Sequence, residues 1–288
     1  MAAFEPREWA TRTVNWQPAR TAIKRAVHTA ADARGRLLER RGDVPTPSNI
    51  LAAGPQKAGS QWIKALFDHP LVRSATGLMT LPQLDYQLTP PRHGFPAATF
   101  VPGYYGSYQE LAALPQRGSR KVVYLGRDPR TMVVSGYWSA VETHRPTHLE
   151  EVEDLRTELR GLPMEEALVR LIHSASDLFA TMETWIDVAD PDVARFRLED
   201  VATDAEGQVG AMFEHCGIRL SEDDFATVLR ETSRDALRSK DLAHRKGDTE
   251  GHYRSRPSDY REVFTPVHYA TFEEVAPGLV ARLGYPPA

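Results

Sequence analysis

A lysine and a serine lie in a run of small residues, Gly54–Ser60 (GPQKAGS), where they could bind a phosphate group. The run follows an apolar stretch, Asn49–Ala53, that is typical of a buried strand, and it precedes Trp62–Phe67, which is typical of a helix. A strand, a tight turn and a helix start aim backbone N–H groups and the positive helix end at one point. Lys57 adds a full positive charge and Ser60 a hydroxyl donor, so the pattern predicts a phosphate-binding loop.

This loop differs from the usual nucleotide triphosphatase loop. That motif places its lysine directly after the second glycine, followed by a hydroxyl that binds Mg²⁺. Here Lys57 comes before Gly59. Taken alone, the loop is equally compatible with a plain strand-to-helix turn that carries a solvated lysine. A second stretch of the chain adds weight to the phosphate interpretation.

The second stretch places an arginine at the end of another strand. Val122–Leu125 is typical of a buried strand, and Asp128 is a good N-cap for the helix that follows. Arg127 therefore lies at the carboxyl end of a strand, where open α/β sheets bind ligands. With Ser135 two turns into the helix, its guanidinium would suit a phosphate monoester. The alternative is a surface ion pair of Arg127 with Asp128 or Glu142.

Together, these stretches resemble the cytosolic-type sulfotransferase family, which uses 3′-phosphoadenosine 5′-phosphosulfate (PAPS). Lys57–Trp62 (KAGSQW) is similar to the family's 5′-phosphosulfate loop, Lys-Ser-Gly-Thr-Thr-Trp. Arg127–Ser135 is similar to its 3′-phosphate motif, with the same eight-residue separation. Arg197–Asp200 (RLED) resembles its Arg-Tyr-Glu-Asp segment. Thr232–Ser233 and the later His244–Gly247 (HRKG) resemble its Thr-Ser-Phe and Arg-Lys-Gly segments, so four matches occur in the family's order.

The resemblance implies a P-loop-kinase-like sulfotransferase fold, an α/β domain with a central parallel sheet flanked by helices. The alternation of strands and helices along the chain predicts the same sheet. The implied activity is transfer of a sulfo group from PAPS to a hydroxyl or amine of a small-molecule acceptor, leaving 3′,5′-ADP (PAP), without a metal. Two alternatives are a small-molecule kinase of the phosphate-loop type and a non-catalytic module that binds PAPS or PAP.

The resemblance also assigns roles to residues. Lys57 would stabilise the leaving phosphate, and Trp62 either stacks on adenine or packs in the core. Three positions depart from the family pattern, because Gln61 replaces a threonine, Leu198 a tyrosine and Arg234 a phenylalanine. The expected cofactor-binding residues are Lys57, Ala58, Gly59, Ser60, Gln61, Trp62, Arg127, Ser135, Leu198, Thr232, Arg234, Arg245, Lys246 and Gly247.

The general base is the largest departure. The family usually carries a histidine in Lys-x-His-x-Pro, but Phe100–Ser107 contains none, and Tyr104, or Tyr105 if the gap shifts, falls at that position. A tyrosine is a poor base near neutral pH unless its pKa is perturbed. Either Tyr104 is perturbed, or the upstream His93 substitutes, or the acceptor needs no strong base. We expect both tyrosines to line an acceptor pocket within a long loop, residues 80–106, with His93 as the leading base candidate.

The composition argues against some classes of binding partner and indicates a cellular compartment. The net charge of −4 and the pI of about 6.2 give no global basic field for nucleic acid or an anionic membrane. The single Cys216 excludes an internal disulfide and is expected to be a buried thiol. The sequence contains no apolar run that could span a bilayer and no Cys/His metal cluster. We expect a cytoplasmic protein.

The chain divides into an Arg-rich N-terminal extension, residues 1–46, and a sulfotransferase domain, residues 47–288. The extension has a helical stretch near Arg20–Arg41 that either packs on the domain or contacts a partner, such as a second copy in a homodimer. The acidic run Glu150, Glu151, Glu153 and Asp154 is interpreted as a solvated face, and the insertion 248–257 as a cap on the site. Further expected elements are helices over Gln109–Leu114, Met164–Val188, Gly207–Cys216 and Glu222–Arg230, and a strand over Val193–Leu198.

Overall fold

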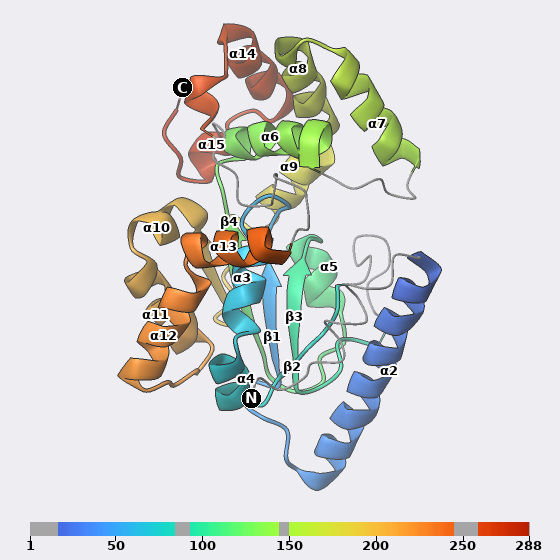
Figure 1. The fold of residues 1–288 in the computed structure, drawn as a ribbon, viewed down its shortest axis with the longest axis vertical. Helices are drawn as coiled ribbons and strands as arrows, with labels where there is room; N and C mark the ends of the chain where they lie inside the picture. The colour runs from blue at the N-terminus through green and yellow to red at the C-terminus, as the bar shows by residue number, and fades with distance from the viewer. Residues whose placement is uncertain (1–16, 84–92, 144–149, 245–258, 288) are drawn as a thin grey trace.

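A central sheet of five parallel strands organises the chain, in the order β2-β3-β1-β4-β5. The computed structural model describes residues 17–83, 93–143, 150–244 and 259–287. Figure 1 shows the strand arrows pointing the same way, toward the layer that contains α6. The strands are β1 (Asn49–Ala53), β2 (Met79–Thr80), β3 (Thr99–Tyr104), β4 (Arg120–Gly126) and β5 (Val193–Arg197). The predicted α/β fold with a central parallel sheet is confirmed.

Helices surround the sheet. They are α2 (Gln17–Arg41), α3 (Ser60–Phe67), α4 (Pro70–Thr76), α5 (Tyr108–Ala113), α6 (Pro129–Trp138), α7 (Glu150–Gly161), α8 (Met164–Ser174), α9 (Ser176–Glu183), α10 (Leu198–Thr203), α11 (Ala205–His215), α12 (Glu222–Thr232), α13 (Arg234–His244), α14 (Pro266–Val275) and α15 (Leu279–Arg282). A π-helical turn, η1 (Ser139–Thr143), extends α6, and a 3₁₀ turn, η2 (Tyr260–Glu262), precedes α14. None of the described helices is long and apolar enough to cross a bilayer.

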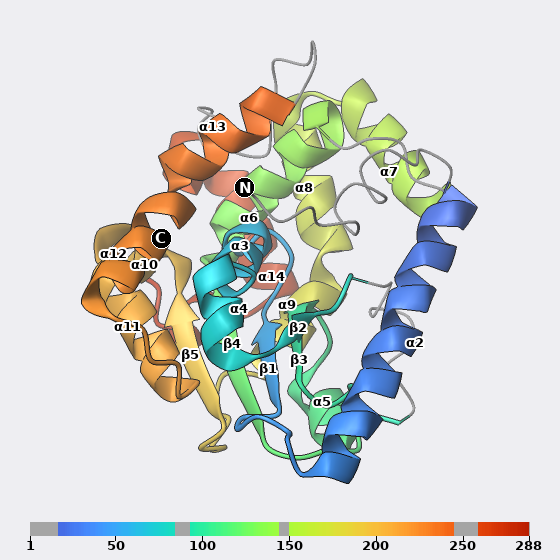
Figure 2. The ribbon, with the colours of Figure 1, turned by 60° about the horizontal axis from the view of Figure 1, so that its bottom comes forward.

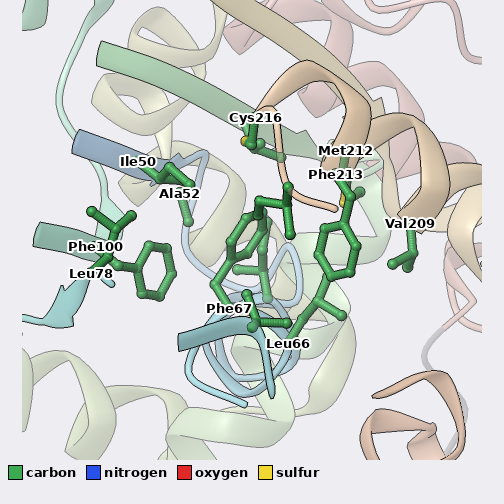
Figure 3. Packing of buried hydrophobic residues seen from close by; sticks show 14 of the residues in the cluster. Ile50, Ala52, Leu66, Phe67, Leu78, Phe100, Val209, Met212, Phe213 and Cys216 are labelled. Atoms are coloured by element: carbon green, nitrogen blue, oxygen red, sulfur yellow. The ribbon is translucent and has the colours of Figure 1, made fainter. Parts of the chain in front are cut away.

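One face of the sheet packs against α3, α4, α11 and α12. Figure 3 shows this core, in which Ile50 and Ala52 of β1 lie near side chains from α3 and α11. The Phe67 ring of α3 stacks on Phe100 of β3 at 5.1 Å between centroids and meets Phe213 of α11 edge-on at 5.9 Å. These contacts fix α3, and therefore the loop that precedes it, against the sheet.

The opposite face forms a second core. Successive strand residues point to opposite faces, so Leu51, Val101 and Tyr124 lie here with Trp185. The Trp185 ring stacks on Tyr124 at 4.9 Å between centroids. A third cluster, built largely from α6, α8, α9 and α14, lies beyond the carboxyl ends of the strands (Figure 1). The carboxyl edge of the sheet is therefore covered by a separate helical layer.

The N-terminal helix α2 packs along the β2–β3 side of the sheet (Figure 2). Its Ala31 is fully buried, and Arg34 donates hydrogen bonds to the carbonyl oxygens of Ala98 at 3.0 Å and Gly77 at 2.9 Å. Arg117 forms ion pairs with Asp32 and Glu39 of the helix. Of the two roles considered for this helix, packing on the domain is the one observed. The division at residue 46 and a homodimer contact stay predictions.

The segment 80–106 contains a strand, so its prediction as one long loop is wrong. Pro102 and Gly103 lie inside β3 and mask its strand pattern. Gly103 has a φ of 79°, and the β1–β3 register shifts between Ala52 and Ala53 at this level. The irregular stretch is a bulge that only a residue free to adopt positive φ accommodates. Tyr104, the last residue of β3, is consequently a strand residue.

Two helix assignments differ from the structure. The helix predicted over residues 164–188 is divided at Ala175 into α8 and α9. Leu168 of α8 packs in the helical layer whereas Trp185 packs on the sheet, and one straight helix could not serve both cores. The acidic run interpreted as a solvated face lies in α7, where Asp154 is exposed and Glu153 half-buried, while Leu159 of the same helix is fully buried. Helix α13 was not predicted, and the insertion 248–257 lies outside the described residues.

Candidate active site

The loop between β1 and α3 has the backbone geometry of an anion site. Lys57 has a φ of 70° and Gly59 a φ of 86°, both in the left-handed region. Gly59 is the N-cap of α3, and a Cβ built on it would lie 2.9 Å from Leu198 Cδ1, so a side chain does not fit there. The Gly54 N–H donates to the Tyr104 carbonyl at 3.1 Å, which joins the loop to β3. Backbone N–H groups at such a turn and helix start favour a bound anion.

The Lys57 side chain points to the far end of α6, where its Nζ donates a hydrogen bond to Ser139 Oγ. Burial, and secondarily the positive charge of Arg127, lowers the pKa of Lys57 to about 8. The ammonium is therefore less stable here than in water. An anion bound in the loop would raise this pKa again, because it favours the charged form.

Arg127 joins the two predicted phosphate stretches directly, since its Nη1 donates to the Lys57 carbonyl at 2.9 Å. Burial lowers the pKa of Arg127, the Glu199 and Tyr285 neighbours oppose that shift, and the charge of Arg234 adds to it. Arg234 thus lies close to Arg127. The buried Arg127 guanidinium, with further positive charge from Arg234, makes a second place beside the loop where an anion would be stabilised.

The Asp128 carboxylate is paired with Arg130 and has only a minor effect on the pKa of Arg127, which it raises. The buried Arg130 binds this carboxylate with Nη2 at 2.7 Å and Nε at 3.0 Å. The Asp128 backbone N–H donates to Glu199 Oε1 at 3.1 Å, and Glu199 Oε2 accepts from the Tyr285 hydroxyl at 3.1 Å. Glu199 therefore links β5–α10, the start of α6 and the C-terminal segment around Arg127.

The other expected cofactor residues take varied positions. Ala58 is buried, Ser60 and Gln61 form the first turn of α3, and Trp62 is half-buried against the sheet core. Leu198 lies over Gly59 at the start of α10. Of the remaining predicted residues, Ser135 is half-buried on α6, Thr232 is buried with its hydroxyl donating to Val228 O at 2.7 Å, and Arg245, Lys246 and Gly247 lie outside the described residues.

The structure does not bring the two base candidates into the loop. His93 is exposed, and its neighbour Gly94 packs against Pro115, ahead of β4. The carbonyl of Pro96, three residues on, accepts a hydrogen bond from Asn49 Nδ2 at 2.7 Å, and Asn49 is the first residue of β1, so this segment lies near the amino edge of the sheet whereas Lys57 follows the carboxyl end of β1. Tyr104 is fully buried, with its hydroxyl 3.4 Å from Ser107 O, and burial, with a smaller effect of Glu110, raises its pKa. A tyrosine with a raised pKa is a weaker base.

Tyr105 faces the carboxyl edge instead. It is half-buried, and its hydroxyl accepts a hydrogen bond from Gln83 Nε2 at 2.8 Å. Tyr105 directly follows the last residue of β3, at the same edge of the sheet where the Lys57 loop leaves β1. Of the two expected pocket-lining tyrosines, Tyr104 is a core residue and Tyr105 keeps the pocket interpretation.

The sulfotransferase domain family matches residues 107–284, more than half of the chain. The chain belongs to the sulfotransferase family. The match begins after β3, so it includes Arg127 and β5 but not the Lys57 loop.

The fold of this sulfotransferase also resembles solved structures. A mouse sulfotransferase complexed with PAP superposes with a TM-score of 0.56 at 18% identity, covering 81% of this chain and 84% of that one. Retinol dehydratase in complex with retinol and PAP gives a TM-score of 0.47 at 15% identity, covering 81% of each chain. Comparison with curated protein sequences found no match. At these identities the likeness to the mouse enzyme concerns the fold.

Two residues of the sulfotransferase site were missed in the sequence. Ser139 contacts Lys57, and its position one helical turn after Ser135, on the same helix face, could have indicated it. Glu199 lies in the segment that resembles Arg-Tyr-Glu-Asp, but its link to Tyr285 joins residues far apart in sequence. The expected burial of Cys216 is observed, and burial raises the pKa of its thiol to about 12. Within the described ranges, no group of three His, Cys, Asp or Glu side chains could hold a metal ion.

Proposed function

We propose that this sulfotransferase moves a sulfo group from PAPS to a hydroxyl or amine of a small-molecule acceptor and releases PAP. One observation carries the proposal. The Arg127 guanidinium donates to the Lys57 carbonyl, so the two cationic elements that would bind the two phosphates of one nucleotide are in contact. The family membership and the fold shared with a PAP-bound mouse enzyme support the same cofactor.

The 5′-phosphosulfate would lie in the Lys57 loop. Negative charge develops on the bridging phosphate oxygen as the sulfo group leaves, and the Lys57 ammonium would stabilise it. The backbone N–H groups of Gly59, Ser60 and Gln61 would hold the phosphate at the start of α3. Catalysis of this kind rests on positioning and fixed electrostatics more than on covalent chemistry from the protein.

The 3′-phosphate would be bound by Arg127 and Ser135, with Arg234 contributing positive charge. Burial lowers the pKa of Arg127 and the charge of Arg234 adds to that shift, so a bound phosphate would stabilise the Arg127 guanidinium and favour a nucleotide that carries this phosphate. Trp62 and Leu198 flank the loop and are the proposed contacts of the adenine side. Arg245, Lys246 and Gly247 are proposed as further 3′-phosphate ligands from the family resemblance alone.

The geometry favours an acceptor that needs little help from a base. Tyr104 is buried with a raised pKa, and His93 lies at the other edge of the sheet. An acceptor group that is readily ionised, such as an acidic phenol, would attack the sulfur without strong general-base assistance. Tyr105 is the proposed contact for such an acceptor, through its ring or its hydroxyl.

The expected compartment is the cytoplasm. The single Cys216 is buried, and a chain without a disulfide framework suits a reducing environment. The proposed cytoplasmic location is tested by fractionation of the source cells.

The test is an acceptor panel incubated with PAPS, in which mass spectrometry detects the gain of one sulfo group. Lys57→Ala should lower kcat about 10²–10³-fold, with a smaller loss of PAP affinity, since a transition-state charge contact is removed. Lys64→Ala, on the same helix outside the loop, is the matched control and should keep both values. Equal losses of kcat and PAP affinity in Lys57→Ala would reject the leaving-group role.

The pH profile gives a second readout. The ammonium form of Lys57 is the active one, and its pKa in the free protein is lowered to about 8 by burial. The value of kcat/KM for PAPS should therefore be maximal below this pH and fall as the pH rises through it. Tight PAP binding without any turnover across the panel would favour a non-catalytic module. Binding of ATP–Mg²⁺ in place of PAP would favour a kinase.

A further inference from the structure

The last turn of α6 is a π-helical turn, Ser139–Thr143, which is rare and marks a local departure from regular helix geometry. A π-helical turn pairs a carbonyl with the N–H five residues on rather than four, so its backbone groups are spaced differently from those of a regular helix. Ser139, the first residue of the turn, is buried, and its hydroxyl accepts the hydrogen bond from Lys57 Nζ. The irregular turn therefore supplies the side chain that contacts the proposed catalytic ammonium.

Two arginines from α7 bind the carbonyl groups of this turn. Arg156 Nε donates to Ala140 O at 3.2 Å. Arg160 Nε donates to Val141 O at 3.1 Å, and its Nη2 lies 3.4 Å from Ala140 O. The two carbonyls are therefore bound by charged side-chain donors from α7.

Arg156 is unusual among them because it is only 3% exposed. A buried guanidinium is costly unless it is paired, and Glu153 Oε1 lies 2.6 Å from its Nη1. Burying the Arg156 guanidinium in α7 therefore costs more free energy than leaving an arginine at the surface would. Its contacts to Ala140 O and Glu153 account for the arrangement.

We propose that Arg156 and Arg160 are positioning residues that hold the π-helical turn in the form that places Ser139 Oγ on Lys57 Nζ. Through that hydroxyl they set the direction and the protonation of the ammonium. The consequence for sulfo transfer rests on the proposed function, whereas the coupling from α7 to Lys57 does not. The competing explanation is that the two arginines only fasten α7 to α6.

The coupling predicts a direction. An oxygen that accepts a hydrogen bond from an ammonium favours its charged form, so loss of the Ser139 contact lowers the pKa of Lys57 further. Among the described residues, the charge that acts on the Lys57 ammonium is that of Arg127, two residues before α6, and it already lowers the pKa of Lys57. If the π-helical turn relaxed, the Ser139 hydroxyl would move away from Lys57 Nζ. The pKa of Lys57 would then fall, as it would if the hydroxyl were removed.

The experiment is a ¹³C NMR titration of the full chain with lysine labelled at Cε. The chain has six lysines, and the Lys57 signal is assigned as the one missing from Lys57→Arg. Ser139→Ala should shift the Lys57 titration down by about one pH unit. Arg156→Met should shift it the same way, and the Ser139→Ala/Arg156→Met double variant should shift it no further than Ser139→Ala alone. No donor is needed, so this result is independent of sulfotransferase activity.

Arg170→Met is the matched control, because Arg170 Nε forms an exposed ion pair with Glu158 of α7 at 2.8 Å and does not touch the turn. It should leave the Lys57 titration unchanged. Arg160→Met replaces an exposed side chain and gives the second variant if Arg156→Met does not fold. In an active preparation, both should lower kcat with little change in the KM for PAPS. A folded Arg156→Met or Arg160→Met chain with wild-type Lys57 titration, or additive shifts in the double variant, would overturn the proposal.

Discussion

Replacement of Arg127 should separate two tasks that its guanidinium performs together. Under the proposed function it binds the 3′-phosphate, and in the structure its Nη1 also donates to the Lys57 carbonyl at 2.9 Å. Loss of a buried, charge-assisted contact to a phosphate should weaken 3′,5′-ADP binding by about 2–4 kcal/mol, or roughly 30- to 1,000-fold, in Arg127→Met.

The sequence alone predicts that 5′-AMP, which lacks the 3′-phosphate, would be barely affected. The hydrogen bond to Lys57 O changes that expectation, because it supports the loop that would hold the 5′-phosphate. Its net contribution of about 0.5–1.5 kcal/mol predicts a two- to tenfold loss for 5′-AMP in Arg127→Met. The loss for 3′,5′-ADP should stay clearly larger.

Isothermal titration calorimetry of both nucleotides at one ionic strength measures the difference. Arg195→Met is the control, since Arg195 is an exposed arginine of β5 that donates to Trp185 O at 3.1 Å, and it should change neither affinity. Equal losses for the two nucleotides in Arg127→Met would refute the 3′-phosphate assignment. An unchanged 5′-AMP affinity would refute the support of the loop by Arg127.

Two further predictions concern the loop and the acceptor side. Gly59→Ala should weaken PAP binding by at least tenfold and lower the free energy of unfolding by about 1–2 kcal/mol, because the φ of Gly59 is 86° and the new Cβ would lie 2.9 Å from Leu198 Cδ1. Calorimetry measures the affinity and chemical denaturation the stability, and wild-type values of both would contradict the steric reasoning. Tyr105→Phe should raise the acceptor KM several-fold because it removes the hydroxyl that Gln83 binds, whereas Tyr104→Phe should leave steady-state rates unchanged; a rate loss confined to Tyr104→Phe would reverse these assignments.

The parts of the site that could be predicted are those encoded by neighbouring residues. The strand predicted over Asn49–Ala53 has the same bounds in the structure, and small residues after it correctly indicated a turn. Asp128 was expected to cap the next helix, and its carboxylate accepts from the Arg130 N–H at 2.9 Å. Turn and capping signals act within a few residues, so sequence spacing carries them.

The parts that could not be predicted depend on which face or edge of the sheet a residue occupies. His93 is only a short segment upstream of Tyr104, yet β3 runs between them and carries them to opposite edges of the sheet. The bulge at Gly103 hid that strand, and without it the burial of Tyr104 and the outward direction of Tyr105 could not be assigned. A shift of one residue in the β3 register would exchange the positions of Tyr104, which is in the core, and Tyr105, which is the proposed acceptor contact.

Contacts near the two ends of α6 hold Lys57 in place. Arg127, directly before α6, holds the Lys57 carbonyl, and Ser139, directly after α6, holds its Nζ. Both contacts restrain a residue whose φ of 70° is unfavourable for a side chain other than glycine. Because a helix of this length is a rigid rod of about 15 Å, a movement of α6 would disturb the two contacts together rather than one at a time. Under the proposed function, a movement of α6 would therefore change donor binding at Arg127 and the orientation of the Lys57 ammonium together.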